Sequence, residues 1–273
     1  MNNNKIQTEN FMDFNSDAII TIGTRVSTDN PKVQEYISRM ITKNECDFIY
    51  MHPIDDISLQ DKYKQYIKYE AGSEEGVFAL LASFLIANAP KEYKDYLEDL
   101  DIGYLSGESS VGEEELELLV ENLTVKKEIT LLIGDDIIGH KSFENISKLI
   151  RLIDSYTEIN VVLLNSNMKI DLSSKSVPKE ISDINTYNGT VVYTVNSTED
   201  ILKGSSSFAM AAKIQDGNIV DITYDGSSVR KKFEIDSAVR GTIALYPIIS
   251  QKDESTMLSG YRFKQVKIQR VES

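Results

Sequence analysis

The chain is poor in the residues that form crosslinks and bind transition metals. Its 273 residues include one cysteine, Cys46, and two histidines, His52 and His140. A disulfide framework, a structural zinc site and a cysteine-ligated iron–sulfur cluster all need more such ligands than this. Cys46 stands between Glu45 and Asp47, whose carboxylates raise a thiol pKa and weaken its nucleophilicity. We therefore expect no cluster, zinc site or disulfide, and interpret Cys46 as a small packing residue.

Long apolar runs are also missing. The longest spans residues 77–87, which is shorter than the ~20 residues that a membrane-spanning helix needs. No basic segment followed by an apolar stretch stands at the N-terminus, so nothing indicates export. We expect a soluble intracellular protein without direct membrane insertion.

Basic residues are fewer than acidic ones. The chain has 29 lysines and arginines against 43 acidic residues, a net charge of −14. Such a surface repels the phosphates of nucleic acids and of anionic lipids. The basic spots at 126–127 and 230–232 are typical of solvated surface positions. We therefore predict that the chain binds no nucleic acid.

The apolar residues that are present predict an α/β domain over residues 11–170. Continuous apolar runs at 18–22, 47–51, 129–133 and 160–164 are typical of strands buried on both faces of a parallel sheet. Helical periodicity follows the first run, from Pro31, and the third, over 142–156. Two strand–helix–strand units predict parallel pairing with right-handed crossovers. The expected fold is a mostly parallel sheet with helices on both faces.

The pattern changes after residue 170. Residues 171–204 are interpreted as a linker or long loop, with a possible strand at 190–195. Residues 205–273 alternate between apolar and polar positions and predict a small antiparallel all-β module. Within it, we predict a hairpin of 208–214 with 219–224 around Asp216-Gly217, and a second turn at Asp225-Gly226.

Several segments resemble a known family. SDAIITIG at 16–23 followed by Asn30-Pro31, YMHP at 50–53 and GSEEGV at 72–77 are similar to three segments of the molybdopterin oxidoreductase superfamily. Within it, the chain most resembles the large iron–sulfur subunit of NADH-quinone oxidoreductase, the respiratory complex I. The resemblance covers most of residues 13–170, and the end of the chain, 260–268, is similar to the end of some bacterial members.

The resemblance implies a nucleotide-type site at the ends of the strands. Its degenerate candidate residues are Gly23, Asn30, Gly72, Ser73 and Gly134. Family members use iron–sulfur clusters or molybdopterin, and the ligands for both are absent from this sequence.

The site also departs from the family pattern in charge. Asp55-Asp56 replace a family arginine, and Glu74-Glu75 occupy a helix N-terminus that could receive a phosphate. Because these carboxylates repel a pyrophosphate, we expect an empty site and no cofactor in this chain.

Catalytic and metal-binding interpretations of the remaining polar residues are weaker. His52 and His140 lie near predicted strand ends, but no nucleophile with an orienting acid can be paired with either, which favours structural histidines. Asp135-Asp136 could bind Mg²⁺ at a strand end, although capping or solvation is the more common role of such a pair. We predict no catalytic residue and no metal ligand.

Two functions of different classes follow. The first is a non-catalytic structural portion of an NADH-quinone oxidoreductase. This portion would help to assemble the electron-transferring peripheral arm with other subunits, on the cytoplasmic side of the inner membrane. The alternative is a free-standing α/β nucleotide-binding protein or enzyme that uses pockets at Gly23 and Gly134. A molybdopterin-binding enzyme is a third and poorer possibility, because the metal and cluster ligands are missing.

Overall fold

The structure, a computed structural model, describes residues 11–165, 168, 170, 176–249 and 260–271. The chain divides into two compact units. The first contains the residues up to 24 together with 30–53 and 60–186. The second contains residues from 187 onward and two short segments from early in the chain, 25–29 and 54–59.

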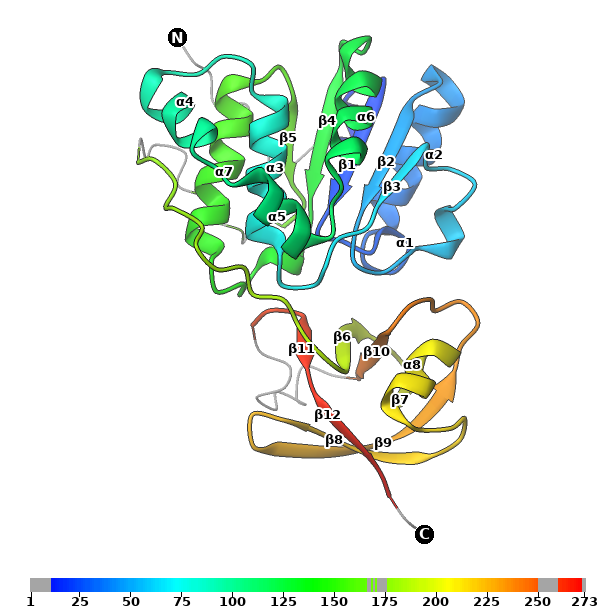
Figure 1. Cartoon of the computed structure of the whole chain (residues 1–273). Helices are drawn as coiled ribbons and strands as arrows, with labels where there is room; N and C mark the ends of the chain where they lie inside the picture. Colours follow the sequence, from blue (N-terminus) through cyan, green and yellow to red (C-terminus); the bar gives the residue numbers. More distant parts are fainter. Residues whose placement is uncertain (1–10, 166–167, 169, 171–175, 250–259, 272–273) are drawn as a thin grey trace. The chain divides into compact units, whose positions relative to one another are not determined.

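A parallel sheet forms the centre of the first unit, as the continuous apolar runs predicted (Figure 1). Its strands are β1 (Ala18–Ile22), β2 (Asp47–Met51), β3 (Gln65–Ile67), β4 (Ile129–Ile133) and β5 (Asn160–Leu163). They are ordered β3-β2-β1-β4-β5, and every neighbouring pair is parallel. All five residues of β1 are buried, because strands on both sides and helices on both faces exclude water from it. The short strand β3 is an addition to the predicted set.

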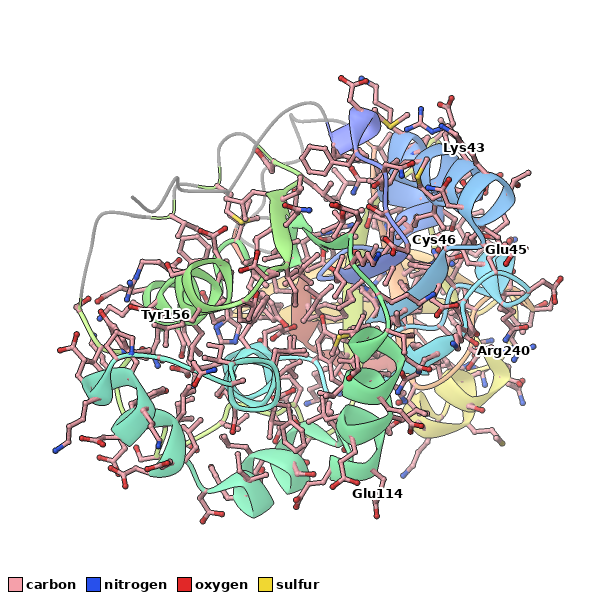
Figure 2. All side chains as sticks on the ribbon, turned by 90° about the horizontal axis from the view of Figure 1, so that it is seen from above. Lys43, Glu45, Cys46, Glu114, Tyr156 and Arg240 are labelled. Atoms are coloured by element: carbon pink, nitrogen blue, oxygen red, sulfur yellow. The ribbon has the colours of Figure 1, made fainter. Side chains whose placement is uncertain are left out.

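Helices cover both faces of this sheet. They are α2 (Pro31–Asn44), α3 (Glu74–Leu85), α4 (Lys91–Glu98), α5 (Ile102–Ser109), α6 (Glu113–Thr124) and α7 (Phe143–Tyr156), with 3-10 turns at Phe11–Asp13 and Asp135–Ile137. Seen from above, α2, which ends near the labelled Lys43, lies on one side of the strands, and α6 and α7, marked by Glu114 and Tyr156, lie on the other (Figure 2). Residues 77–82 of α3 are all buried, which explains their unbroken apolar character.

The second unit is built on a mostly antiparallel sheet of seven strands. These are β6 (Val191–Asn196), β7 (Ile201–Gly204), β8 (Ile219–Tyr224), β9 (Ser227–Ile235), β10 (Ile243–Ile248), β11 (Phe263–Gln265) and β12 (Lys267–Arg270). Their order is β11-β6-β10-β7-β9-β8-β12, with parallel pairing only between β6 and β10 and between β7 and β9. The two edge strands β11 and β12 are separated in the chain by Val266 alone. The chain therefore joins the two edges of the sheet through a single residue, which leaves no long free edge.

One predicted hairpin is wrong. Residues 206–212, expected in part as a strand, form helix α8 (Ser206–Ala212), whereas β8 and β9 pair around the predicted turn at Asp225-Gly226. The segment Phe208–Ala212 contains no β-branched residue and has three alanines, which favour a helix. Ser205 supplies the N-cap, its hydroxyl oxygen accepting the Phe208 N–H at 3.0 Å.

The second sheet also includes strands that precede residue 205. β6 and β7 lie within the range interpreted as a linker or long loop, and β6 falls at the possible strand noted there. Part of that range, residues 171–175, lies outside the described residues. Two further segments join this unit: α1 (Val26–Asp29) and a 3-10 turn, Ile57–Leu59.

Among the described residues, the helices fall short of the length and apolar character needed to cross a membrane.

Candidate functional site

The strand order places a switch in direction between β1 and β4. From β1 the chain moves through α2 to β2 and β3 on one side of the sheet, whereas β4 leads through α7 to β5 on the other. Open α/β sheets bind ligands at such a point, beyond the carboxyl ends of the strands. Gly23 and Gly134, two of the predicted site residues, directly follow β1 and β4 and therefore lie there.

Gly23 and Gly134 are in close backbone contact. The Gly134 N–H donates to the Ile22 carbonyl at 2.9 Å, and the Asp136 N–H donates to the Gly23 carbonyl at 3.0 Å. An ideal Cβ on Gly134 would lie 2.3 Å from both the Gly23 oxygen and the Thr24 Cβ. The loops after β1 and β4 therefore bind each other at the position where a nucleotide site would present backbone N–H groups to a phosphate.

Asn30 makes a side-chain hydrogen bond to the loop that follows β1. It stands at the N-cap position of α2, with Pro31 as the first helical residue, as the sequence predicted. Its side chain makes no capping hydrogen bond; the amide instead donates to the Thr24 hydroxyl at 2.7 Å. Asn30 therefore holds Thr24, which is itself packed near Gly134.

Gly72 and Ser73 form the turn into α3. Gly72 has φ +92°, a left-handed conformation that favours glycine. Ser73 is the N-cap residue and is fully buried, but its hydroxyl donates to the Glu70 carbonyl at 2.7 Å and leaves the helix uncapped by a side chain. The structure thus places both predicted residues at the expected turn and occupies them with contacts inside the chain.

The two glutamates at the start of α3 are buried rather than solvated. Glu74 is 0% exposed, and its Oε2 lies 3.5 Å from His140 Nε2. Glu75 is 9% exposed and accepts a hydrogen bond from the Asn145 amide at 2.7 Å. Both side chains therefore contribute to the packing of α3 against the loop and helix that follow β4.

His140 has a defined tautomer. The Ser142 N–H donates to its Nδ1 at 3.0 Å, so this nitrogen carries no proton, and Nε2 donates to the Gly72 carbonyl at 3.0 Å. Burial lowers the pKa of His140, and this outweighs the opposing effect of the Gly72 carbonyl and of Glu75. A neutral histidine thus links the loop after β4 to the turn before α3.

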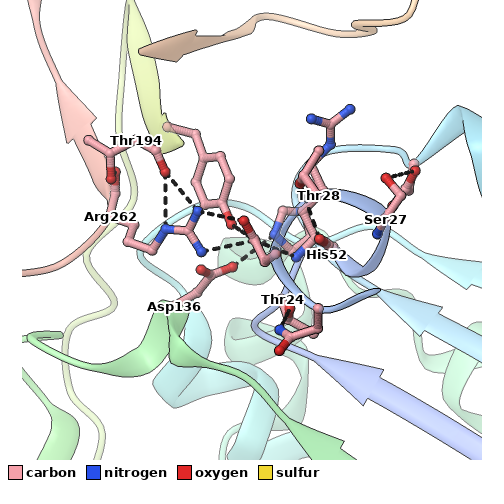
Figure 3. A network of polar contacts seen from close by, with 12 residues as sticks. Thr24, Ser27, Thr28, His52, Asp136, Thr194 and Arg262 are labelled. Carbon is pink, nitrogen blue, oxygen red and sulfur yellow. Dashed lines mark hydrogen bonds and ion pairs between the residues drawn. The ribbon is translucent and has the colours of Figure 1, made fainter. Parts of the chain in front are cut away.

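His52 and Asp136 form a second buried contact. His52 Nε2 and Asp136 Oδ2 are 2.9 Å apart, and both side chains are fully buried (Figure 3). The Tyr50 ring stacks on the imidazole with centroids 5.8 Å apart, and the Tyr66 hydroxyl donates to the His52 carbonyl at 3.0 Å. His52 and His140 are therefore both buried and hydrogen-bonded within the first unit.

The aspartates considered for Mg²⁺ have protein partners. Asp136 contacts His52, and Asp135 accepts a hydrogen bond from the Asn165 amide at 3.1 Å. In the part of the chain that the structure describes, no three His, Cys, Asp or Glu side chains are grouped so that they could hold a metal ion.

Sequence reasoning did not single out Tyr69, which lies beside this cluster. Its side chain is fully buried, and its pKa is raised well above the usual value, first by burial and then by the negative charges of Glu74 and Asp136. Its only sequence signal was a place in a polar, tyrosine-rich stretch. Two buried carboxylates close to one phenol make this region unfavourable for a further anion.

Asp55 and Asp56, whose carboxylates were expected to repel a pyrophosphate, contact other residues of the chain. Asp56 is buried and accepts hydrogen bonds from the backbone N–H and hydroxyl of Ser27, at 2.9 and 2.7 Å, and from Ser58 at 2.8 Å. Asp55 lies 3.8 Å from Arg240. All these contacts fall within the second unit, where they hold the segments 25–29 and 54–59.

Comparison with known proteins supports the fold alone. No family model matches the chain, and no curated protein sequence matches it. Among solved structures, the chain is similar to acetylene hydratase from Pelobacter acetylenicus, with a TM-score of 0.57 and 6% sequence identity. The similarity covers 95% of this chain and 78% of that one, so it extends over both units.

Proposed function

We propose that this chain is a non-catalytic structural portion of an NADH-quinone oxidoreductase, similar to part of the large iron–sulfur subunit, that contributes to assembly of the electron-transferring peripheral arm. Its partners would be the other subunits of that complex. It would lie on the cytoplasmic side of the inner membrane and associate with it through those subunits. The sequence resemblance over residues 13–170 suggests this assignment, and the fold likeness to acetylene hydratase is consistent with the architecture on which the resemblance depends.

One observation carries the non-catalytic part of the proposal: the contact between Gly23 and Gly134. The Asp136 N–H that could face a phosphate donates to the Gly23 carbonyl instead. A ligand at this point would have to separate two backbones and enter beside the buried carboxylates of Glu74 and Asp136. Removing such groups from their partners costs several kcal/mol, so an assembly role fits this unit better than cofactor binding.

Nucleotide binding is tested with the purified full chain. Melting temperature is measured with NADH, NADPH and guanine nucleotides, and metal and flavin content are measured on the same sample. A ligand at 100 times its dissociation constant would stabilise the fold by ~2.7 kcal/mol, a clearly visible shift. We expect no shift, no iron or molybdenum and no flavin. A shift abolished by Gly72→Ala would instead support the alternative, a free-standing nucleotide-binding protein or enzyme.

Assembly is tested in the source cells. Deleting the gene should reduce the amount of the intact NADH-quinone oxidoreductase on a native gel and its membrane-associated NADH:quinone activity. The wild-type gene should restore both. The Cys46→Ser variant should restore them equally, because the proposal assigns no electron-transfer role to the thiol. Unchanged assembly and activity after deletion would reject the proposal.

A further inference from the structure

An irregular segment of the first unit packs against its helices. Residues 176–184, here called the strap, contain neither helix nor strand, yet Pro178 and Ile184 are buried. Val177 and Ile181 pack against the same hydrophobic core as α3 and α7. The strap therefore covers part of the helical layer without adding a regular element to it.

Side chains of the helices bind the backbone of the strap. The Lys179 N–H donates to Asn145 Oδ1 at 2.6 Å, and Asn145 Nδ2 donates to the Lys179 carbonyl at 3.1 Å. A carboxamide has one donor group and one acceptor, and it satisfies both backbone groups of one extended residue. This contact recognises the backbone and not the lysine side chain, which is exposed.

Two further backbone contacts fix the ends of the strap. An Arg151 nitrogen donates to the Ser176 carbonyl at 3.1 Å, and the Ile184 N–H donates to the Tyr104 hydroxyl at 3.0 Å. Arg151 lies in α7 and Tyr104 in α5. Polar side chains of two helices, α5 and α7, therefore hold the backbone of the strap at three positions along it. The surface of α3, α5 and α7 under the strap is here called the groove.

The groove also has room for one apolar side chain over Gly76, a position here called the seat. Ile184 is 5% exposed, and an ideal Cβ on Gly76 of α3 would lie 2.5 Å from its Cδ1. Gly76 has no left-handed backbone, so its conformation does not require glycine. Glycine in a helix costs about 1 kcal/mol relative to alanine. The missing side chain is explained by the room that it leaves for Ile184.

We propose that the groove between α3, α5 and α7 is a binding site for an extended peptide, and that the strap is its intramolecular ligand. The ligand class is a peptide whose backbone is held at one residue by Asn145 and whose aliphatic side chain, at the position of Ile184, enters the seat over Gly76. Because the strap is attached to the same chain, its binding is intramolecular, and it excludes competing peptides unless it is weakened.

The test uses the full chain with Ile184→Asp and a fluorescent peptide of sequence SVPKEISDINT, residues 176–186. The substitution places a charge in the apolar seat and weakens the strap, so the peptide should bind saturably, as measured by fluorescence anisotropy. Wild-type protein should bind it at least about ten-fold more weakly. Should Ile184→Asp fail to fold cooperatively, Ile184→Ser serves as the same weakened strap.

Variants of the groove test whether peptide binding depends on the contacts that hold the strap. In the weakened background, Asn145→Ala removes the two hydrogen bonds to the strap backbone and also the Asn145 contact with Glu75. In a variant that still unfolds cooperatively, it should reduce affinity by roughly ten-fold or more. Thr124→Ala, at an exposed position in α6, should leave affinity unchanged. A peptide with Asp at the position of Ile184 should not bind. If a folded, weakened variant fails to bind the peptide at about 1 mM, or binds it equally after Asn145→Ala, the strap is ordinary packing and the proposal is wrong.

Discussion

Arg262 donates two parallel hydrogen bonds, of 2.9 and 3.1 Å, to the carboxylate of Asp29, which lies 233 residues earlier in the chain. The guanidinium lies 4.2 Å from the centroid of the Tyr193 ring, whose hydroxyl donates to the same carboxylate at 2.8 Å. The Arg262 guanidinium also donates to the Thr194 carbonyl, a contact drawn in Figure 3. Arginine alone can make the bidentate, stacked and backbone contacts together.

Arg262→Lys should therefore destabilise the second unit by about 2 kcal/mol. A lysine ammonium cannot make the two parallel hydrogen bonds of the guanidinium, so it leaves Asp29 poorly paired. The measurement is urea denaturation followed by tyrosine fluorescence. The control is Arg230→Lys, since Arg230 makes a similar two-bond contact with Asp221 at an exposed site. We expect the control to unfold at the wild-type urea concentration. Equal urea midpoints for Arg262→Lys and Arg230→Lys would contradict the stabilising role given to Arg262.

His140 makes stability depend on pH. Its neutral form accepts the Ser142 N–H, and burial lowers its pKa below the usual 6.5. The unfolded chain therefore takes up a proton at a higher pH than the folded chain does. By linkage, the contribution of His140 is fully present above about pH 6.5 and is lost as the pH falls toward the folded-state pKa.

The test of His140 compares wild type with His140→Asn in urea titrations between pH 5 and 8. The difference in unfolding free energy between them should shrink below pH 6.5, by at most ~1.4 kcal/mol per pH unit. Glu74, Glu75 and Lys141 are the charged groups near the imidazole and remain in both proteins. A difference that stays constant with pH would show that His140 does not titrate differently in the two states.

The parallel sheet could be predicted because its signal is local. Strands β1, β2 and β4 are continuous apolar runs that end at a glycine or proline, and they begin and end where the runs do. β3 was missed because its three residues, Gln65–Ile67, lie in a polar stretch, and pairing with β2 rather than composition makes them a strand. Residues 208–212 were misassigned because apolar residues in a short segment fit a helix or a strand equally well.

The contacts of the candidate site could not be predicted in this way. Gly23 and Gly134 were noticed because each follows an apolar run, whereas Gly72 was singled out by the resemblance of residues 72–77 to a family segment. That Asp136 contacts His52, and that Glu75 contacts Asn145, depends on residues about 70 to 84 positions apart in the chain. Sequence reasoning placed Glu74 and Glu75 at a helix N-terminus, where they would repel a phosphate. It did not identify their partners, His140 and Asn145, in the segment that follows β4.

Cys46 should be inert in the folded protein. Its side chain is buried, and burial, the largest effect, raises the pKa of the thiol to about 12. Because the thiolate is the reactive form, reaction with an aromatic disulfide reagent at pH 8 should follow local or global unfolding. One thiol should react promptly in concentrated urea and slowly without it. Prompt reaction of the native protein would contradict the buried position.

The contact between Gly23 and Gly134 makes the most specific prediction about the switch point. A Cβ at Gly134 would meet the Gly23 oxygen and Thr24 at 2.3 Å. Because the first of these is backbone, the two loops must separate. Gly134→Ala should lower the unfolding free energy by about 1–3 kcal/mol, the usual cost of forcing extra atoms into a packed site. Gly107→Ala is the matched control, because nothing lies within 4 Å of its ideal Cβ. It should stabilise α5 by about 0.5–1 kcal/mol.

Both glycine variants are compared with wild type by urea denaturation and by melting temperature with and without NADH. If the loops separate enough to free the Asp136 N–H, Gly134→Ala could gain a weak response to the nucleotide. The buried carboxylates of Glu74 and Asp136 oppose this, so we expect lower stability and still no response. A Gly134→Ala protein as stable as wild type would mean that the loops can move apart at little cost. The alternative, a nucleotide pocket that opens at Gly23 and Gly134, would then become the better account of this unit.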